Sequence, residues 1–355
     1  MLSKRQITGI LFSFIVIGTF IRLYQLSFQC YWIEEDFTIM MMKLPVPTLF
    51  LSSYTIDANP PIYYLLSKSF GIITNYSDIS IRYPSLIFGI LTIPAMYFCG
   101  REYKNEITGL FAAGITTVLF PLIFYSQFGR AYSTMWFFFV ITLTMYIHIH
   151  NTGCTRRNGI LFAVFAVVSV WTHLFVIVPI SMMILDLIQT YRRQALIPAF
   201  ISVALISPVL FYTRAAIDIT SNSNYTERYG IPMWKLIVIT PVEILGPAYI
   251  ALFAFAGIGW VFDESKIKIR LMAIALATIV CVIAVSEVIA IFPRYYSSPM
   301  FIFVLFISVL CGKICEDLKM KPVHVVATLC IVISFLLMLQ YPAMINHYFT
   351  QRYTC

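Results

Sequence analysis

Runs of about 20 apolar residues recur along this 355-residue chain and constrain its fold more than any other feature. A helix needs roughly 20 such residues to cross about 30 Å of hydrocarbon. The sequence therefore predicts an all-α integral membrane protein with about eleven transmembrane helices. The predicted spans lie near 7–27, 82–100, 107–125, 132–150, 159–173, 174–190, 195–213, 237–261, 270–291, 296–313 and 322–342.

The composition excludes the main soluble alternatives. Hydrophobic residues make up 60% of the chain and charged residues only 11%, whereas a soluble domain is about 25% charged. So few charges do not cover the surface of a soluble protein of this size. Soluble enzymes, nucleic-acid-binding proteins and disordered proteins are therefore excluded, and no nucleic-acid partner is expected.

The basic residues predict how the spans are oriented. With a cytoplasmic N-terminus and eleven spans, every short inner segment carries Lys or Arg, as the positive-inside rule requires. The apolar stretch 60–75 is short and contains Lys68, so we expect an interfacial helix there, since a full crossing would reverse the bias of all later loops. The inner segments hold Lys4, Arg5, Arg101, Lys104, Arg156, Arg157, Arg192, Arg193, Lys266, Lys268, Arg270, Lys313, Lys319 and Lys321.

No stretch is long enough for a separate soluble domain. We expect one transmembrane module over 1–190, including a large outer loop at 28–81. Residues 191–355 then form C-terminal transmembrane helices with a second outer loop at 214–236. Most remaining basic residues, Arg22 among them, and several acidic residues lie at outer span ends. Because charges at membrane depth are costly and usually functional, we expect the chemistry on the outer face.

The first outer loop opens with three consecutive carboxylates, Glu34, Glu35 and Asp36, just beyond the end of a span. Packing does not require them. Successive carboxylates repel one another, which makes one of them a candidate general base. The alternative is a solvated loop start in which Trp32 anchors the chain at the membrane interface.

A second acidic motif follows in the same loop, D-A-N-P-P-I-Y-Y at 57–64. Its two prolines fix the start of the interfacial helix, and the residue before a proline avoids the helical region. Asp57 can then point back toward the carboxylates at 34–36. The alternative is that Asp57 serves only in helix capping.

Two arginines occupy short outer turns, where the positive-inside rule disfavours them. Arg130 lies in S-Q-F-G-R-A-Y at 126–132, and Arg294 lies in P-R-Y-Y at 293–296. A guanidinium in such a place is expected to have an anionic partner and suits a phosphate or a carboxylate. The alternatives are lipid-headgroup contact for Arg130 and a structural ion pair with Glu287 for Arg294.

These motifs together predict a pocket on the outer face, with carboxylates at one wall and arginines at another. Such a pocket suits a lipid-linked anion beside a carboxylate that activates a nucleophile. His173 falls at the outer end of a short span and is either part of this pocket or a hydrogen-bonded packing residue. The other histidines show no metal-ligand spacing.

The order of the motifs resembles the GT-C-type polytopic glycosyltransferases, in particular the protein O-mannosyltransferase and aminoarabinose-transferase superfamily and its small prokaryotic members. Their pattern runs W-x-D-E-A, D-x-x-P-P-L-Y-Y, R-L-P-S-A-L-F-G, Y-S-Q-E-A-R-x-Y and a late P-R-Y. This chain has W-I-E-E-D at 32–36, D-A-N-P-P-I-Y-Y at 57–64, R-Y-P-S-L-I-F-G at 82–89, Y-S-Q-F-G-R-A-Y at 125–132 and P-R-Y at 293–295. The match is strong over 1–175 and thin afterwards.

Three positions depart from that pattern. Glu34 stands where the family usually has its catalytic Asp, and Asp36 stands where a small residue is usual. Phe128 replaces the Glu of the Q-E-A-R segment. The longer Glu34 side chain leaves open whether Glu34, Glu35 or Asp36 is the base.

The resemblance implies a GT-C-like fold with a catalytic module at 1–190 and a polyprenyl- or dolichyl-phosphate sugar as donor. In such an enzyme Arg130 and Arg294 neutralise the leaving lipid phosphate. Glu34, or its neighbour Glu35, deprotonates the acceptor hydroxyl, which attacks with inversion. Asp57 supports the base.

The resemblance also implies a substrate pocket and leaves a metal open. Some relatives use a divalent cation and others do not, and oxygen ligands from Glu34 and Asp57 would fit Mg²⁺, Mn²⁺ or Ca²⁺. No cofactor is required with certainty. The residues expected to line the pocket are Asp36, Asn59, Tyr63, Tyr64, Tyr132, His173 and Tyr295.

Two other classes of protein remain open. A transporter or flippase of a lipid-linked anion would also use intramembrane charges, although it usually has internal repeats and broken helices near the midplane. A catalytically inactive membrane scaffold is the second. For an enzyme, the acceptor is a glycan, a lipid or a protein. The expected location is a prokaryotic plasma membrane, with a eukaryotic endomembrane as the alternative.

Overall fold

The computed structural model describes residues 2–222, 233–285 and 292–349, and over these residues it consists of helices and loops without a strand. The all-α prediction is confirmed. Residues 223–232 of the predicted outer loop 214–236 lie outside the described residues, as does Glu287. The described parts of that loop are helical, at the end of α12 (Leu210–Asn222) and the start of α14 (Met233–Leu245).

Among the described residues, seven helices are long and apolar enough to cross a membrane, or nine if each of two bent pairs counts as one span. The predicted number of about eleven is not confirmed. Helices also form at two further predicted spans, but α9 (Arg156–Thr172) has only 17 residues and α17 (Met300–Asp317) ends in ionisable side chains. The seven are built from α1 (Lys4–Leu23), η1 (Asp78–Ile81) with α5 (Arg82–Tyr103), α8 (Tyr132–Thr152), η2 (Leu174–Val176) with α10 (Ile177–Tyr191), α11 (Arg193–Ile206) with η3 (Ser207–Val209) and the start of α12, α16 (Lys268–Val285) and α18 (Pro322–Phe349).

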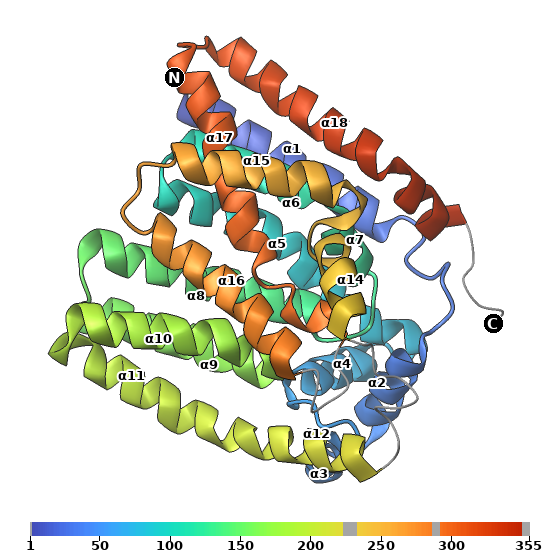
Figure 1. The fold of residues 1–355 in the computed structure, drawn as a ribbon. Coiled ribbons are helices and arrows are strands. Elements are labelled where there is room, and N and C mark those ends of the chain that lie inside the picture. Colours follow the sequence, from blue (N-terminus) through green and yellow to red (C-terminus); the bar gives the residue numbers. More distant parts are fainter. Residues whose placement is uncertain (1, 223–232, 286–291, 350–355) are drawn as a thin grey trace.

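The centre of the molecule is a bundle of α5, α6 (Glu106–Val118), α8 and α17. Helix α5 packs along α6 and α8, α8 packs along α9, and α17 packs against α6 and against α15 (Tyr249–Phe262). Residues 300–309 of α17 are all buried, as expected for a helix that is apolar all round. Helix α18 lies along one edge (Figure 1), and its apolar surface is mostly exposed, as suits contact with lipid.

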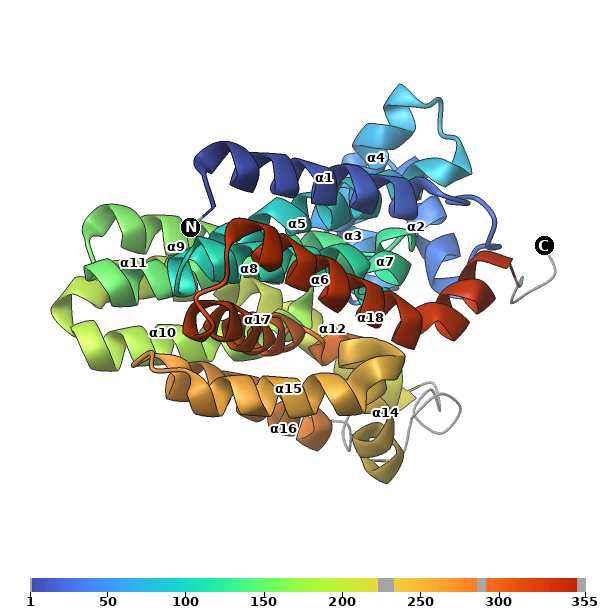
Figure 2. The same ribbon diagram turned by 90° about the horizontal axis from the view of Figure 1, so that it is seen from above.

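Short helices cluster at one end of this bundle, opposite the N-terminus of the chain (Figures 1 and 2). They are α2 (Ile33–Lys43), α3 (Val46–Thr55) and α4 (Ile62–Ile73). The 12 residues of α4 rise about 18 Å, which is too short to cross about 30 Å of hydrocarbon. Helix α4 therefore has the length expected of the predicted interfacial helix at 60–75.

Two helix breaks lie near the same end. Helix α6 bends by 58° into α7 (Phe120–Ser126), and α14 turns by 107° through η4 (Gly246–Ala248) into α15. Leu119 joins α6 to α7 in an extended conformation, and a proline stands in the first turn of α7, where its missing N–H costs no helical hydrogen bond. The first break directs α7 toward the cluster of short helices.

Candidate active site

Glu35 anchors the start of α2 to two other elements. Its carboxylate is fully buried and pairs at two points with Arg82 at the start of α5, with 2.8 Å from Nε to Oε1 and 2.9 Å from Nη2 to Oε2. The backbone N–H groups of Gly129 and Trp32 donate to the same two oxygens. Because both oxygens are occupied, the geometry does not support our prediction that Glu35 is an alternative base.

Glu34 points into the site instead. Its Oε1 accepts a hydrogen bond of 2.5 Å from Nη2 of Arg294, and its side chain is 26% exposed. Its second oxygen, Oε2, accepts no hydrogen bond from the part of the chain that the structure describes. Glu34 is therefore a partly accessible carboxylate with an oxygen available to accept a proton, which a general base requires.

Asp57 pairs with the second arginine. Nη1 of Arg130 lies 3.0 Å from Oδ2 of Asp57, and the hydroxyl of Tyr64 donates to the same oxygen. Burial opposes the charge of Arg130, but Asp57 together with Tyr132 and Tyr295 outweighs it and raises the pKa of Arg130 above its ordinary value. The loop before α4 and the turn before α8 are thus tied together by a buried ion pair.

The two arginines converge on Glu34. Nη1 of Arg130 donates to the backbone carbonyl of Glu34 at 3.2 Å, while Arg294 holds the Glu34 side chain and donates from Nε to the hydroxyl of Tyr132 at 2.9 Å. Four segments far apart in sequence therefore meet: α2, the loop before α4, the turn before α8, and η5 (Pro293–Tyr296). The structure brings Glu34, Asp57, Arg130 and Arg294 into one site.

Aromatic rings cover these charges on one side. The Tyr132 ring centroid lies 5.3 Å from that of His173 and 6.4 Å from that of Tyr295. His173 is 4% exposed, and its Nδ1 accepts from the N–H of Phe175. Burial, followed by the charges of Arg130 and Arg294, lowers the pKa of His173 to about 3. His173 is therefore neutral near pH 7, which agrees with its interpretation as a packing residue.

The residues predicted to line a substrate pocket gather around a small cavity beside Arg130. Its volume is about 10 Å³, enough for about one water molecule and far too small for a sugar. A sugar therefore binds there only if the side chains that line the cavity move apart. Its lining includes five of the predicted residues, namely Asn59, Tyr63, Tyr64, Tyr132 and His173.

Tyr63 lines this cavity but forms hydrogen bonds elsewhere through its hydroxyl, and Asp36 does not line the cavity. The Tyr63 hydroxyl donates to the carbonyl of Ile81 at 2.7 Å and lies 2.7 Å from the hydroxyl of Ser85, so it fastens α4 to the start of α5. Asp36 is exposed on the first turn of α2 and lines neither the small cavity nor the larger one described next. Its carboxylate therefore lies at the margin of the site.

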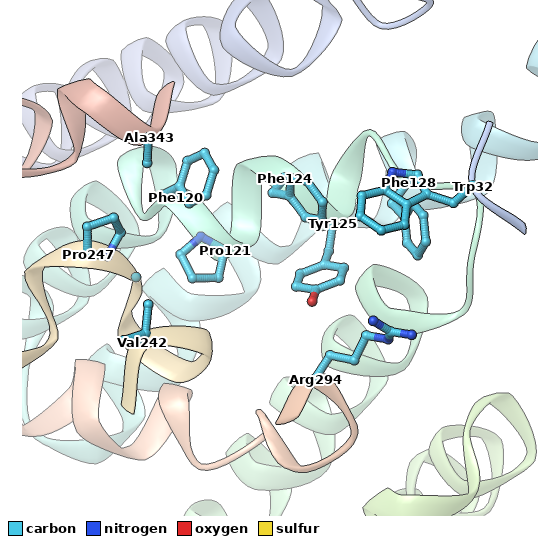
Figure 3. A pocket seen from close by; sticks show the side chains of 11 residues that line it. Trp32, Phe120, Pro121, Phe124, Tyr125, Phe128, Val242, Pro247, Arg294 and Ala343 are labelled. Carbon is cyan, nitrogen blue, oxygen red and sulfur yellow. The ribbon is translucent and has the colours of Figure 1, made fainter. Parts of the chain in front are cut away.

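A larger cavity of about 320 Å³ reaches Arg294 from the other side (Figure 3). Arg294 is the one charged residue among the described residues that line it, and Figure 3 shows its guanidinium below Tyr125 and Phe128. An apolar cavity with one cation suits an amphiphile with an anionic head. The other lining residues are Trp32, Phe120, Pro121, Phe124, Val242, Gly246, Pro247 and Ala343.

The same geometry tests the expected divalent-cation site. Each candidate ligand is already neutralised by an arginine, Glu34 by Arg294 and Asp57 by Arg130. Over the described ranges there is no group of three or more His, Cys, Asp or Glu side chains placed to hold a metal ion. A cation bound by Glu34 and Asp57 would have to displace both guanidiniums, and a divalent cation at these residues stays a prediction.

Sequence analysis did not assign a role to Arg82 or to the aromatic residues of α7. The sequence did contain a signal for Arg82. It is a basic residue at the end of a predicted span, and the three carboxylates at 34–36 in the preceding outer loop had no assigned basic partner. Phe124 had none, because aromatic residues within an apolar run look the same whether they face lipid, the core or a cavity. Tyr125 opens the motif at 125–132, but the motif did not give it a role.

Comparison with solved structures identifies the fold. ArnT from Cupriavidus metallidurans matches in its apo state with a TM-score of 0.65 and 12% identity over 96% of this chain. The same protein bound to undecaprenyl phosphate matches with 0.64 and 10% over 96%. Archaeal oligosaccharyltransferase AglB from Archaeoglobus fulgidus, in complex with an inhibitory peptide and a dolichol-phosphate, matches with 0.61 and 11% over 96%. The predicted GT-C-type fold is confirmed.

This chain is shorter than the proteins it resembles. It spans 65% and 66% of the two ArnT chains and 56% of the AglB chain. No protein-family model and no curated protein matches the sequence. The likeness therefore rests on the arrangement of helices.

Proposed function

We propose that this chain is a membrane glycosyltransferase that moves a hexose or pentose from a polyprenyl- or dolichyl-phosphate donor to an acceptor hydroxyl, with inversion at the anomeric carbon. The observation that carries the proposal is the position of Arg294. Its guanidinium is the one described charge in an apolar cavity of about 320 Å³, and it holds the Glu34 carboxylate. A lipid phosphate that entered this cavity would therefore meet a cation and a candidate base at one point.

The donor phosphate takes the place of a carboxylate. Arg294 now pairs with Glu34, and a phosphate entering along the apolar cavity competes for the same guanidinium. The donor phosphate is a diester with one negative charge, as a carboxylate has, and it suits a planar guanidinium as well as a carboxylate does. A second charge develops on it as the sugar leaves. Binding of the phosphate releases the Glu34 side chain. Two of the matched structures hold such lipids, undecaprenyl phosphate and a dolichol-phosphate, which supports this assignment.

The transfer step follows from the charges of the site. Glu34 takes the proton of the acceptor hydroxyl as the acceptor oxygen forms its bond to the anomeric carbon. The bond between that carbon and the phosphate oxygen breaks at the same time, and the lipid phosphate leaves with the electron pair. Arg294 and Arg130 stabilise the charge that develops there. Glu34 then releases its proton to water.

We place the site on the extracytoplasmic face. The charge distribution of the loops puts Lys4 and Arg5 in the cytoplasm, and the site lies at the opposite end of α1 (Figure 1). Cys30, just beyond α1, is disulfide-bonded, and disulfides persist in oxidising compartments outside the cytosol. The plasma membrane of a prokaryote satisfies both observations.

The acceptor is a glycan, a lipid or a protein. Another matched structure, of the Archaeoglobus fulgidus oligosaccharyltransferase, is tethered with an acceptor peptide, which supports a protein acceptor. For this chain we favour a small glycan or lipid acceptor, with a protein acceptor as the alternative.

Sugar transfer by the purified chain tests the proposal. The protein in nanodiscs is supplied with a panel of radiolabelled polyprenyl-phosphate sugars and with membrane extract as acceptor. Transfer from at least one donor is expected. Donor binding without turnover would instead favour the inactive scaffold, and movement of intact donor across the bilayer would favour the flippase.

A further inference from the structure

Arg22 is a charge inside α1 that the proposed reaction does not use. The side chain is fully buried among apolar helices, where an ionised group is costly and is retained only with strong partners. Its Nη1 donates to the carbonyl of Thr117 at 2.9 Å and its Nη2 donates to the carbonyl of Thr116 at 3.0 Å. Both carbonyls belong to the last turn of α6.

These carbonyls lose their helical partners at the break between α6 and α7. In a continuous helix the N–H of residue 121 would bond to the carbonyl of Thr117, but residue 121 is proline and has no N–H. The N–H of Phe120, which would bond to the carbonyl of Thr116, turns away to Oε1 of Gln340 at 2.6 Å. Arg22 thus replaces two hydrogen bonds that the bend removes.

Gln340 on α18 satisfies the remaining groups of the break. Its Nε2 donates to the carbonyl of Val118 at 3.3 Å while its Oε1 accepts from Phe120. Gln340 is fully buried. Two side chains from opposite ends of the sequence therefore complete all four backbone groups around the 58° bend.

The C-terminal end of α7 is hydrogen-bonded to the end of α1, the helix that carries Arg22. Nε2 of Gln127, the residue after α7, donates to the carbonyls of Arg22 and Tyr24, each at 2.8 Å. Helix α1 thus bonds to the last turn of α6, just before α7, and to Gln127, just after it. Its inner face supplies Phe120, Pro121, Phe124 and Tyr125 to the wall of the large cavity (Figure 3).

We propose that Arg22 and Gln340 are positioning residues for the lipid-phosphate cavity. They replace the backbone hydrogen bonds lost at the α6–α7 break, and so set the direction of α7 and the shape of the cavity that ends at Arg294. The role in donor binding rests on the proposed function, whereas the role in holding α7 does not.

Two readouts on the full chain in nanodiscs test this inference. One is amide hydrogen exchange over residues 116–127, and the other is the affinity for undecaprenyl phosphate. The variants are Arg22→Met, Arg22→Lys and Gln340→Met. The matched control is Asp186→Asn, which breaks a partly buried ion pair with Arg270 on α10 and α16, away from the break.

Arg22→Met is expected to exchange faster at 116–127 and to bind the lipid phosphate about tenfold more weakly, since a small misplacement of a binding group costs at least that much. Arg22→Lys keeps a cation but replaces the planar fork that reaches both carbonyls, so it is expected to lie between Arg22→Met and the wild type in both readouts. Asp186→Asn is expected to lower the melting temperature without changing either readout.

The inference is overturned if Arg22→Met matches the wild type in both hydrogen exchange and lipid-phosphate affinity. It is also overturned if Arg22→Met and Asp186→Asn lose the same stability and change these two readouts by the same amount. If Arg22→Met does not fold, Gln340→Met, which removes only neutral hydrogen bonds, is judged in the same way. If the wild type binds no lipid phosphate, the proposed function fails, and the exchange data alone then decide whether Arg22 holds α7.

Discussion

Replacing Glu35 by Gln is expected to destabilise the protein strongly, although the neighbouring residues 34 and 36 are also carboxylates. Glu35 is fully buried and Arg82 is 1% exposed. Glu35→Gln leaves the Arg82 guanidinium buried without its counter-ion, which costs about 3–5 kcal/mol. Asp36→Asn removes the same charge one residue away from an exposed side chain and is expected to change stability by about 0.5 kcal/mol or less.

Thermal unfolding in detergent, followed by tryptophan fluorescence, measures the difference. At roughly 2–4 °C per kcal/mol, Glu35→Gln should melt well below the wild type, and Asp36→Asn should melt with it. The double variant Glu35→Gln/Arg82→Met should recover part of the loss, because the uncompensated charge is gone. The reasoning is refuted if Glu35→Gln is as stable as Asp36→Asn but has no transferase activity, since Glu35 would then be catalytic.

Three further predictions concern the site and its frame. Arg294→Met should weaken lipid-phosphate binding by about 10- to 100-fold through the loss of charge-assisted hydrogen bonds, measured by titration in nanodiscs, and an unchanged affinity would remove Arg294 from the donor site. His173 has a pKa of about 3 when folded and about 6.5 when unfolded, so it stabilises the fold fully above pH 6.5 and loses that contribution as pH falls toward 3. Lowering the pH from 7 to 5 should cost about 2 kcal/mol, and His173→Gln should flatten that part of the pH–stability curve. Gly129→Ala should destabilise by about 1–3 kcal/mol, because its Cβ would lie 2.6 Å from Cδ1 of Ile81 and 2.9 Å from Oε1 of Glu35; a melting temperature equal to the wild type would contradict this.

The sequence allowed the fold class and the gathering of four charged residues to be predicted, because charge in an apolar chain is informative. Glu34, Asp57, Arg130 and Arg294 stand out among apolar residues, and the structure brings them together. Their pairing could not be predicted, because it depends on contacts between residues as distant as 34 and 294. Sequence therefore did not distinguish Glu35, buried against Arg82, from Glu34, which faces the cavity residue Arg294.

The number of spans and the shape of the pocket could not be established from the sequence, for a different reason. Apolar runs predict how much chain is buried in lipid, but not where a helix bends. Pro121 marks the α6–α7 break, yet its consequence depends on Arg22 and Gln340, which lie far away in the chain. The large cavity beside α7 follows from that bend, and so only the structure reveals it.

The most direct test of the central claim is the rate of sugar transfer by Glu34→Gln, measured beside Asp36→Asn with the same lipid-phosphate sugar donor. Glutamine keeps the size of the side chain and its hydrogen bond with Arg294 but does not take up the acceptor proton. We predict that transfer by Glu34→Gln falls at least about a hundredfold while Asp36→Asn stays near the wild type. Equal rates in Glu34→Gln and the wild type would contradict the assignment of Glu34 as the base.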